Sequence, residues 1–429
     1  MEIRGFRGWR YCSRGECDMG RFLAPPYDIL TESDKRALLS LSDKNIVAVD
    51  LPHCPPAEEG PEAAYAQAAR TLDEWKSSGV LGRYERPAVY AYEQEYRWAG
   101  TTYARRALIC GVRATELGKD IIPHEHTFAG PKADRLKLTQ HTRMQLSPIL
   151  GFYRDPEGQV GNVLGSATSG SPALRGTLRD VTERLWVIDD ASTIAEIATI
   201  LRGVPVYIAD GHHRYATALD YCTRLRTEGK IDGNHEANFA MFALVARDDP
   251  GLLVLPTHRI VRGLRRDFTV PRLIDRTAGL SWQRCSVEDA DLGNVGAFLR
   301  RYGPGAMALM NADPAEIWIA RLKDPEAMLA AAPAESDAWR ALDVAVLHKL
   351  IIDRALEPWR TRDVFIEYTP DAMAVLAACR SERAQLGICL QGTPIESVEA
   401  IAKEGRSMPH KSTYFYPKLA TGVVLKPLE

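Results

Sequence analysis

The sequence predicts an α/β protein with mixed sheets, an α+β arrangement in which antiparallel pairs stand beside helix-linked strands. Short β-branched and aromatic runs alternate with segments whose apolar residues recur every three or four positions. Some of these runs follow one another across a turn, as the strands of an antiparallel pair do. The 429 residues exceed the length at which one hydrophobic core usually stops growing, so two or three domains are expected.

Composition excludes several classes of protein. A hydrophobic fraction of 45% with 26% charged residues is typical of a soluble globular chain. The net charge of -2 gives no general attraction to nucleic acid or to anionic lipid. The sequence contains no run of about 18 apolar residues, so it predicts no membrane-spanning helix. Met1 to Tyr11 carries three arginines but no apolar stretch, which does not match a signal peptide. We expect a cytoplasmic protein without nucleic-acid or membrane partners.

The first half of the chain begins with a loop that ends in Pro25-Pro26-Tyr27-Asp28, where two prolines stiffen a wall carrying Tyr27 and Asp28. Capping residues predict the start of a helix at Thr31. Periodicity predicts three further helices, over 63–76, 135–143 and 192–201. Strands are expected over 45–51, 87–96, 103–113, 147–153 and 185–188. The Gly- and Ser-rich stretch 161–176 has the glycine spacing of a P-loop but no lysine, so we expect a surface loop.

The second half continues with a strand pair over 239–246 and 252–261, followed by Ala-rich, charged helices with short strands up to about residue 343. Further helices are expected over 343–356, 370–379 and 395–404, with strands at 364–368 and 386–390. The change of character near residue 265 predicts an α/β catalytic core over 1–264 and an α+β C-terminal domain over 265–429. We expect the final segment of that domain to pack back on the core, since its aromatic residues favour burial.

The most informative stretch is Val204 to Leu219, where the pattern changes from a strand to a helix at Asp210-Gly211-His212-His213-Arg214. Gly211 allows a tight bend, and the first amide groups of the helix then point into one small volume. Two imidazoles and a guanidinium stand beside these amides. An anion, most simply a phosphate, is the expected guest; a solvated polar first turn with an Asp cap is the alternative.

A second polar stretch, residues 122 to 135, contains His124-Glu125-His126 and then Lys132 and Arg135. In an extended segment His124 and His126 would share one face, which suits a metal ion. The stretch also suits a substrate loop in which Glu125 is a general base and the two cations bind phosphate. A polar surface loop is the third possibility.

Two further groups are candidate anion contacts. His258 and Arg259 emerge from an expected strand, which would otherwise be an exposed edge. Lys411, Ser412 and Thr413 supply one cation and two hydroxyls beside three aromatic residues, and we expect them to close a phosphate site at the central turn.

Five motifs occur in this order in a large bacterial and archaeal family catalogued as domain of unknown function 1015, which the sequence resembles over nearly its whole length. They are Pro25-Pro26-Tyr27-Asp28, His124-Glu125-His126-Thr127, Ala209 to Tyr215, Thr257-His258-Arg259 and Met408 to Lys418. Asp210 to Arg214 also resembles the phosphate-binding turn of the free serine kinases, members of the ParB and sulfiredoxin superfamily that use ADP to phosphorylate the amino acid. The resemblance implies a ParB/sulfiredoxin-like core that binds a nucleotide phosphate.

Phosphoryl transfer consists mainly of positioning and charge neutralisation, so a site needs cations around the phosphate and one base near the attacking oxygen. The expected cations are Arg214, Lys132, Arg135, Arg259 and Lys411. Asp210 or Glu125 is the expected base or metal ligand, and His212 or His213 the general acid or phosphate ligand. The sequence therefore predicts a phosphotransferase or phosphohydrolase for a small phosphorylated metabolite, foremost the serine and phosphoserine pair, with Mg²⁺ and ADP or ATP as cofactors.

Two other functions stay open at this point. His124, His126, His212 and His213 would form the centre of a transition-metal-dependent enzyme. A ParB-like nucleotide-binding regulator is the other, although the chain has neither a basic stripe nor a helix-turn-helix pattern.

Overall fold

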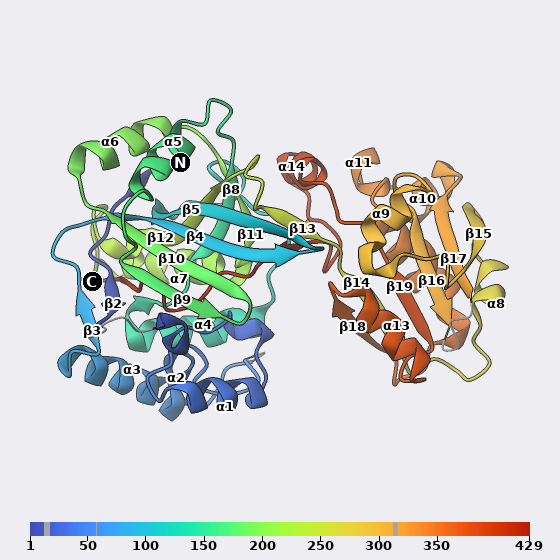
Figure 1. The fold of residues 1–429 in the computed structure, drawn as a ribbon, viewed down its shortest axis with the longest axis horizontal. Helices are drawn as coiled ribbons and strands as arrows, with labels where there is room; N and C mark the ends of the chain where they lie inside the picture. Colours follow the sequence, from blue (N-terminus) through green and yellow to red (C-terminus); the bar gives the residue numbers. More distant parts are fainter. Residues whose placement is uncertain (13–17, 57, 312–315) are drawn as a thin grey trace. The chain divides into compact units, whose positions relative to one another are not determined.

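The computed structural model describes residues 1–12, 18–56, 58–311 and 316–429. The chain forms two compact units (Figure 1): unit 1 comprises Met1–Leu253 and Pro417–Glu429, and unit 2 comprises Val254–Tyr416. The division into a catalytic core (1–264) and a C-terminal domain (265–429) stays a prediction. No helix of the described residues is both long and apolar enough to cross a membrane.

Unit 1 is built on a nine-stranded mixed sheet. Its strands, in spatial order, are β6 (Ile121–Ile122), β11 (Val206–Asp210), β8 (Ile149–Tyr153), β12 (Phe239–Ala246), β5 (Thr101–Arg113), β4 (Val89–Trp98), β10 (Val181–Ile188) and β9 (Leu174–Leu178), with β1 (Ile3–Arg4) beside β5. β12 runs parallel to β8, and β6 parallel to β11. β11 is antiparallel to β8, and the β4–β5 and β5–β12 pairs are also antiparallel. The predicted mixed α/β class is confirmed.

The helices of unit 1 lie on both sides of this sheet in Figure 1, with α5 and α6 on one side and α1, α2 and α3 on the other. They are α1 (Glu32–Leu41), α2 (Val47–Asp50), α3 (Glu62–Ser77), α4 (Ala129–Thr142), α5 (Gln159–Ala167), α6 (Ala191–Ile200) and α7 (His212–Thr227). Two short strand pairs complete the unit, β2 (Trp9–Tyr11) with β3 (Leu81–Arg83) and β7 (Met144–Gln145) with β21 (Lys426–Pro427). Short 3-10 turns lie at Met19–Phe22, Tyr27–Ile29 and Glu236–Asn238.

Unit 2 has its own six-stranded sheet, in which neighbouring strands are antiparallel. Its order is β15 (Leu280–Ser286), β17 (Glu316–Leu322), β16 (Met307–Asn311), β19 (Leu386–Cys389), β14 (His258–Arg262) and β18 (Phe365–Thr369). The helices are α8 (Val270–Ile274), α9 (Val295–Arg300), α10 (Pro325–Ala331), α11 (Asp337–Arg340), α12 (Asp343–Val346), α13 (Ala372–Arg380) and α14 (Ile395–Lys403). β13 (Leu253–Leu255) pairs with β20 (Tyr414–Tyr416).

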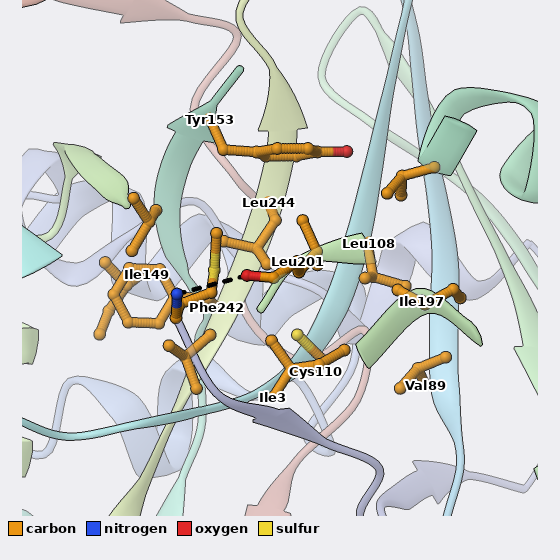
Figure 2. Packing of buried hydrophobic residues seen from close by; sticks show 14 of the residues in the cluster. Ile3, Val89, Leu108, Cys110, Ile149, Tyr153, Ile197, Leu201, Phe242 and Leu244 are labelled. Carbon is orange, nitrogen blue, oxygen red and sulfur yellow. Dashed lines mark hydrogen bonds between the residues drawn. The ribbon is translucent and has the colours of Figure 1, made fainter. Parts of the chain in front are cut away.

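The core of unit 1 packs helix residues against the middle of the large sheet. Figure 2 shows Val89, Leu108 and Phe242 from the sheet beside Ile197 and Leu201 from α6 and the residue that follows it. All five side chains are fully buried, with exposed fractions of 0%. Full burial of such a side chain contributes about 1.5–3 kcal/mol, so this packing fixes the strands that carry the polar residues described below.

Three local predictions are wrong. Residues 45–51 form α2 and its preceding turn instead of a strand, because Asn45 accepts a bond from the Val47 amide and donates to the carbonyls of Arg21 and Leu23. A short, fully buried apolar run does not separate helix from strand by periodicity. The stretch 161–176 lies mostly in α5 and the start of β9 instead of a loop. The strand pair expected over 239–246 and 252–261 does not form, because β12 pairs with β5 and β8, and β13 pairs with β20. The helix expected over 343–356 is present, as α12 and a π-helix at Leu347–Ala355.

Tyr215→Phe tests how α7 is held to the sheet. The Tyr215 hydroxyl, on a fully buried side chain, donates to the Thr115 carbonyl (2.6 Å) and accepts from the Thr115 amide (3.0 Å). Its loss leaves two backbone groups unpaired and should lower the free energy of unfolding by about 1–3 kcal/mol, measured by urea denaturation. Tyr221→Phe, on the same helix and without a hydroxyl bond among the described residues, is the control and should change it by less than about 0.5 kcal/mol. Equal effects of the two variants would contradict this account.

Candidate functional site

The turn between β11 and α7 forms as the sequence predicts. β11 ends at Asp210, Gly211 takes a left-handed conformation with φ 95°, and α7 begins at His212. In the part of the chain that the structure describes, no side chain caps the N-terminus of α7. The first amide groups of a helix have no acceptor within the helix, and the helix dipole makes this end partially positive. The turn therefore has the backbone geometry of an anion site.

Asp210 is the charged centre of this turn. One carboxylate oxygen accepts a bond from Lys418 Nζ (2.6 Å) and the other from Arg214 Nη2 (2.9 Å). Burial alone would raise the pKa of Asp210, but Lys418 and Arg214 hold it well below the ordinary value. Asp210 is therefore ionised, and a carboxylate with so low a pKa is a weak base at neutral pH. Two cations share its single charge, which leaves the turn with a net positive charge.

Gly211 is required here by its conformation and by its surroundings. A Cβ atom at this position would lie 2.9 Å from Arg214 Nε and 3.0 Å from Arg214 Cζ. The guanidinium thus folds back against the turn, where it also donates to the Pro148 carbonyl and to Ser147 Oγ (3.4 Å). A side chain at 211 would displace the one guanidinium that the helix itself supplies to the turn.

Two histidine rings connect α7 to the polar stretch that follows β6. His212 Nε2 accepts a bond from the His124 amide (3.2 Å), and His213 Nε2 accepts one from the Phe128 amide (2.9 Å). His124 Nδ1 faces the Ile208 carbonyl at 2.7 Å, so this nitrogen carries the proton. The His124 and His212 rings lie edge to face, with centroids 4.7 Å apart. Hydrogen bonds between residues 85 and 88 positions apart thus join the two motifs into one structure.

Burial sets the charge of these rings. It lowers the pKa of His124, and it lowers the pKa of His212 well below the ordinary value, with the neighbouring His124 adding to the effect. Both imidazoles are neutral at pH 7. His212 and His213 both accept through Nε2, so the neutral His212 ring carries its proton on Nδ1. In this conformation they are acceptors that hold the loop.

Arg135 forms a second buried ionic group in unit 1. Its Nε donates to Asp134 Oδ2 (2.6 Å) and its Nη1 to the Asp50 carbonyl (2.6 Å), while its guanidinium lies 3.9 Å from the Tyr27 ring centroid. Asp134 Oδ1 also accepts from the Tyr65 hydroxyl (2.7 Å). These partners fix the guanidinium in one orientation.

A cavity of about 50 Å³ lies between the two groups and is lined by both arginines, Arg135 and Arg214. Its other polar lining residues include Tyr27, Asp50, Ser147 and Thr217. A single water needs about 10–15 Å³ of such space, so the cavity can hold several waters or one small organic molecule. It adjoins the turn through Arg214.

The predicted site residues of unit 1 occupy different environments. His124 is buried, Glu125 is half-buried and His126 is exposed, so the two imidazoles of this stretch do not share a face. Lys132 forms an ion pair with Asp220 of α7 (3.4 Å). Asp28 is exposed, next to the buried Tyr27. Within the described part of the chain, no group of three or more His, Cys, Asp or Glu side chains is arranged to hold a metal ion.

The remaining predicted residues belong to unit 2 and form a cluster there. Arg259 is fully buried on β14, which lies between β19 and β18 and is therefore an interior strand and not the exposed edge considered above. Its Nη2 donates to the Lys411 carbonyl (3.1 Å) and lies 3.3 Å from His348 Nε2. The His258 ring accepts a bond from the Leu390 amide (3.1 Å), and the Ser412 carbonyl accepts one from Thr393 (3.0 Å). A role for these residues and Thr413 in phosphate binding stays a prediction.

Sequence reasoning missed four residues of this site: Lys418, Asp50, Ser147 and Thr217. Lys418 ends the last motif of the chain, directly after Pro417, and this position was the available signal. Asp50 follows an apolar run that resembles a strand, while Ser147 and Thr217 have no local pattern that distinguishes them. Only the packing of α2, α7 and the segment between β7 and β8 brings the last three to one cavity.

Comparison with known families identifies the chain's relatives. A family model described as "Protein of unknown function (DUF1015)" matches residues 3–345. The chain belongs to this family. No curated protein matches the sequence.

Three solved structures resemble parts of the chain. A conserved hypothetical protein from Pyrococcus furiosus has 14% identity and a TM-score of 0.33, covering 73% of this chain and 98% of its own. A free serine kinase in complex with AMP has 12% identity and a TM-score of 0.33, with coverage of 72% and 95%. SbnI with a C-terminal truncation, from Staphylococcus aureus, has 10% identity and a TM-score of 0.35, with coverage of 75% and 87%. Similarities of this size carry no information about the reaction, and membership of the ParB and sulfiredoxin superfamily stays a prediction.

Gly211→Ala tests the turn. A non-glycine residue at φ 95° costs about 1–2 kcal/mol, and the added Cβ also displaces the Arg214 guanidinium. We expect a modest loss of thermal stability but at least a tenfold loss of phosphate affinity, measured by isothermal titration calorimetry. Gly203→Ala, at a positive-φ position with open space around it, is the control for backbone strain alone. If both variants bind phosphate as the wild type does, the turn is not the anion site.

Lys418→Met tests the ion pair at Asp210. Because the folded-state pKa of Asp210 lies below its unfolded value, the pair stabilises the fold at pH values above about 4 and this stabilisation disappears as pH falls through the folded pKa. Removing one partner of a largely buried pair should cost about 3 kcal/mol near pH 7, and the difference from wild type should shrink toward pH 2. Denaturation at several pH values measures it, with the exposed Lys230→Met as control. A difference that does not change with pH would contradict the assignment.

Proposed function

We propose that this protein transfers a phosphoryl group to or from a small metabolite, with the phosphate held at the N-terminus of α7. The observation that carries this proposal is the turn itself: an uncapped helix N-terminus beside one carboxylate that is bound by two cations. An anionic ligand would neutralise the net positive charge of the turn and accept hydrogen bonds from the first amides of α7.

Each polar group of the turn then has a defined task, judged by its contacts alone. Arg214 and Lys418 neutralise phosphate charge, which is the main requirement of phosphoryl transfer. Asp210 orients both cations, since each of its oxygens accepts from one of them. His212 and His213 hold the 124–128 segment against the turn, and this segment places Glu125 and the exposed Phe128 at the edge of the site.

The phosphate donor in this proposal is ADP or ATP, and the metabolite is serine or phosphoserine. Both choices rest on the likeness between Asp210 to Arg214 and the phosphate-binding turn of the free serine kinases. Mg²⁺ is part of the proposal as a companion of the nucleotide. The turn does not fit as its ligand, because both oxygens of Asp210 already accept bonds from cations; we therefore assign no step to the metal.

Arg214→Ala and His213→Ala test the proposal. Loss of a charged ligand to the transferred group typically costs about 3 kcal/mol or more in the barrier, so we expect Arg214→Ala to lower turnover at least 100-fold. His213→Ala should also lower it, because the 124–128 segment loses its bond to α7. The assay measures transfer from ADP or ATP to L-serine and release of phosphate from phosphoserine, with and without Mg²⁺.

Arg224→Ala is the matched control, since Arg224 lies on the same helix but is exposed and paired with Asp220. It should leave turnover unchanged. Near-normal activity of Arg214→Ala on the identified substrate would show that the turn is structural.

A further inference from the structure

Asp50 is a buried carboxylate with few partners. Its residue is 4% exposed, and among the described residues its carboxylate accepts one hydrogen bond, a long one of 3.5 Å from Arg135 Nη1. Buried carboxylates normally accept several bonds, because removing them from water costs several kcal/mol. Asp50 lines the cavity described above, so a donor inside the cavity would supply what the protein does not.

Thr217, at the same cavity, provides independent evidence for a ligand. Thr217 is 3% exposed, and its Oγ1 has no hydrogen-bond partner among the described residues. A buried threonine within a helix can satisfy its hydroxyl with a carbonyl one turn earlier, and this one does not. Two polar side chains, from α2 and α7, therefore line one pocket: a carboxylate with a single long hydrogen bond and a hydroxyl without a partner among the described residues.

Both arginines of the cavity are paired with carboxylates. Arg135 is paired with Asp134, and Arg214 with Asp210. A ligand here meets guanidinium groups and hydroxyls together with the apolar side chains of Leu138, Ile149 and Met241. This lining suits a small polar molecule of low net charge that offers a hydroxyl, and the volume excludes a nucleotide.

We propose that this cavity binds the acceptor of the phosphoryl group, a small molecule bearing a hydroxyl, and that Asp50 is the catalytic base which takes the proton of that hydroxyl. The inference rests on the proposed function, because Arg214 is the residue that joins the cavity to the phosphate turn. Thr217 holds the acceptor through its unpaired hydroxyl.

The step conserves atoms and charge. The acceptor oxygen gives its proton to a carboxylate oxygen of Asp50 and forms a bond to the terminal phosphorus of a nucleoside di- or triphosphate. The bond from that phosphorus to the bridging oxygen breaks, and its electron pair leaves with the shortened nucleotide. Asp50 then releases the proton to solvent.

The surroundings of Asp50 suit this role. Burial raises the pKa of Asp50 above its ordinary value; Arg135 and Arg214 act against the shift, and the nearby Asp28 and Asp134 add to it. A carboxylate whose pKa is raised toward neutrality is a better base at pH 7 than one of ordinary pKa. Asp210, whose pKa is lowered, is unsuited to the same task.

Asp50→Asn and Thr217→Val in the full-length chain test this inference. Asp50→Asn should bind ADP within about twofold of wild type by calorimetry, yet transfer phosphate to L-serine at least 100-fold more slowly, in line with the effect of removing a general base. The fall in wild-type rate at acid pH should disappear in this variant. Thr217→Val, which keeps the shape, should raise the KM for the acceptor about fivefold or more, as expected for one lost hydrogen bond, without changing ADP affinity.

Asp43→Asn and Thr223→Val, both at exposed positions, are the matched controls and should behave as wild type. The inference is overturned if Asp50→Asn keeps a third or more of wild-type turnover, or if Thr217→Val leaves the acceptor KM unchanged. It is also overturned if neither L-serine nor glycerol binds the wild type by calorimetry, or if water is the only acceptor.

Failure of the proposed function would look different. In that case the wild type would bind neither ADP, ATP nor inorganic phosphate. Binding of L-serine and glycerol, measured by calorimetry, would then test the cavity separately. The comparison is between the wild type and Ala218→Leu, whose larger side chain fills the cavity. Equal binding by these two proteins would exclude the cavity as a ligand site.

Discussion

The bond between Asp210 and its two cations is the interaction on which the site depends. It joins the end of β11, the first turn of α7 and the segment that begins at Pro417, since Lys418 reaches across 208 positions of the sequence. A largely buried carboxylate is costly without partners, and one cation alone leaves part of that cost uncompensated. Because both oxygens are bonded, the two cations have fixed positions, and any anion that enters meets charges that are already in place.

The His212 and His213 rings fix the loop after β6 to the same turn. Imidazoles that accept bonds from the amides of His124 and Phe128 satisfy backbone groups which a polar loop would otherwise leave to water. Burial keeps the His212 ring neutral, so it remains an acceptor over the physiological pH range. His212 and His213 thus hold the loop in position, and the positive charge of the site comes from Arg214 and Lys418.

Two carboxylates of unit 1 illustrate how surroundings assign roles. Asp210 and Asp50 are both buried, but Asp210 accepts short bonds from two cations, whereas Asp50 accepts one long bond and borders a cavity. Their pKa values move in opposite directions for this reason. Pairs of carboxylates separated in this way commonly divide the work of an active site, one holding charge and the other exchanging a proton.

The sequence by itself determined the strand, the glycine turn and the helix at 206–227, because side-chain periodicity and the conformational freedom of Gly211 are local properties. It also indicated the mixed α/β class and the polar stretch at 122–135. The tertiary structure alone decided that Lys418 pairs with Asp210, that α2 replaces a predicted strand, and that Asp50 meets Arg135 and Arg214 at one cavity. These contacts join residues 85 to 208 positions apart. Contacts between residues so far apart in the sequence form when helices pack on the sheet and buried polar groups pair with one another. No local sequence pattern predicts such pairs.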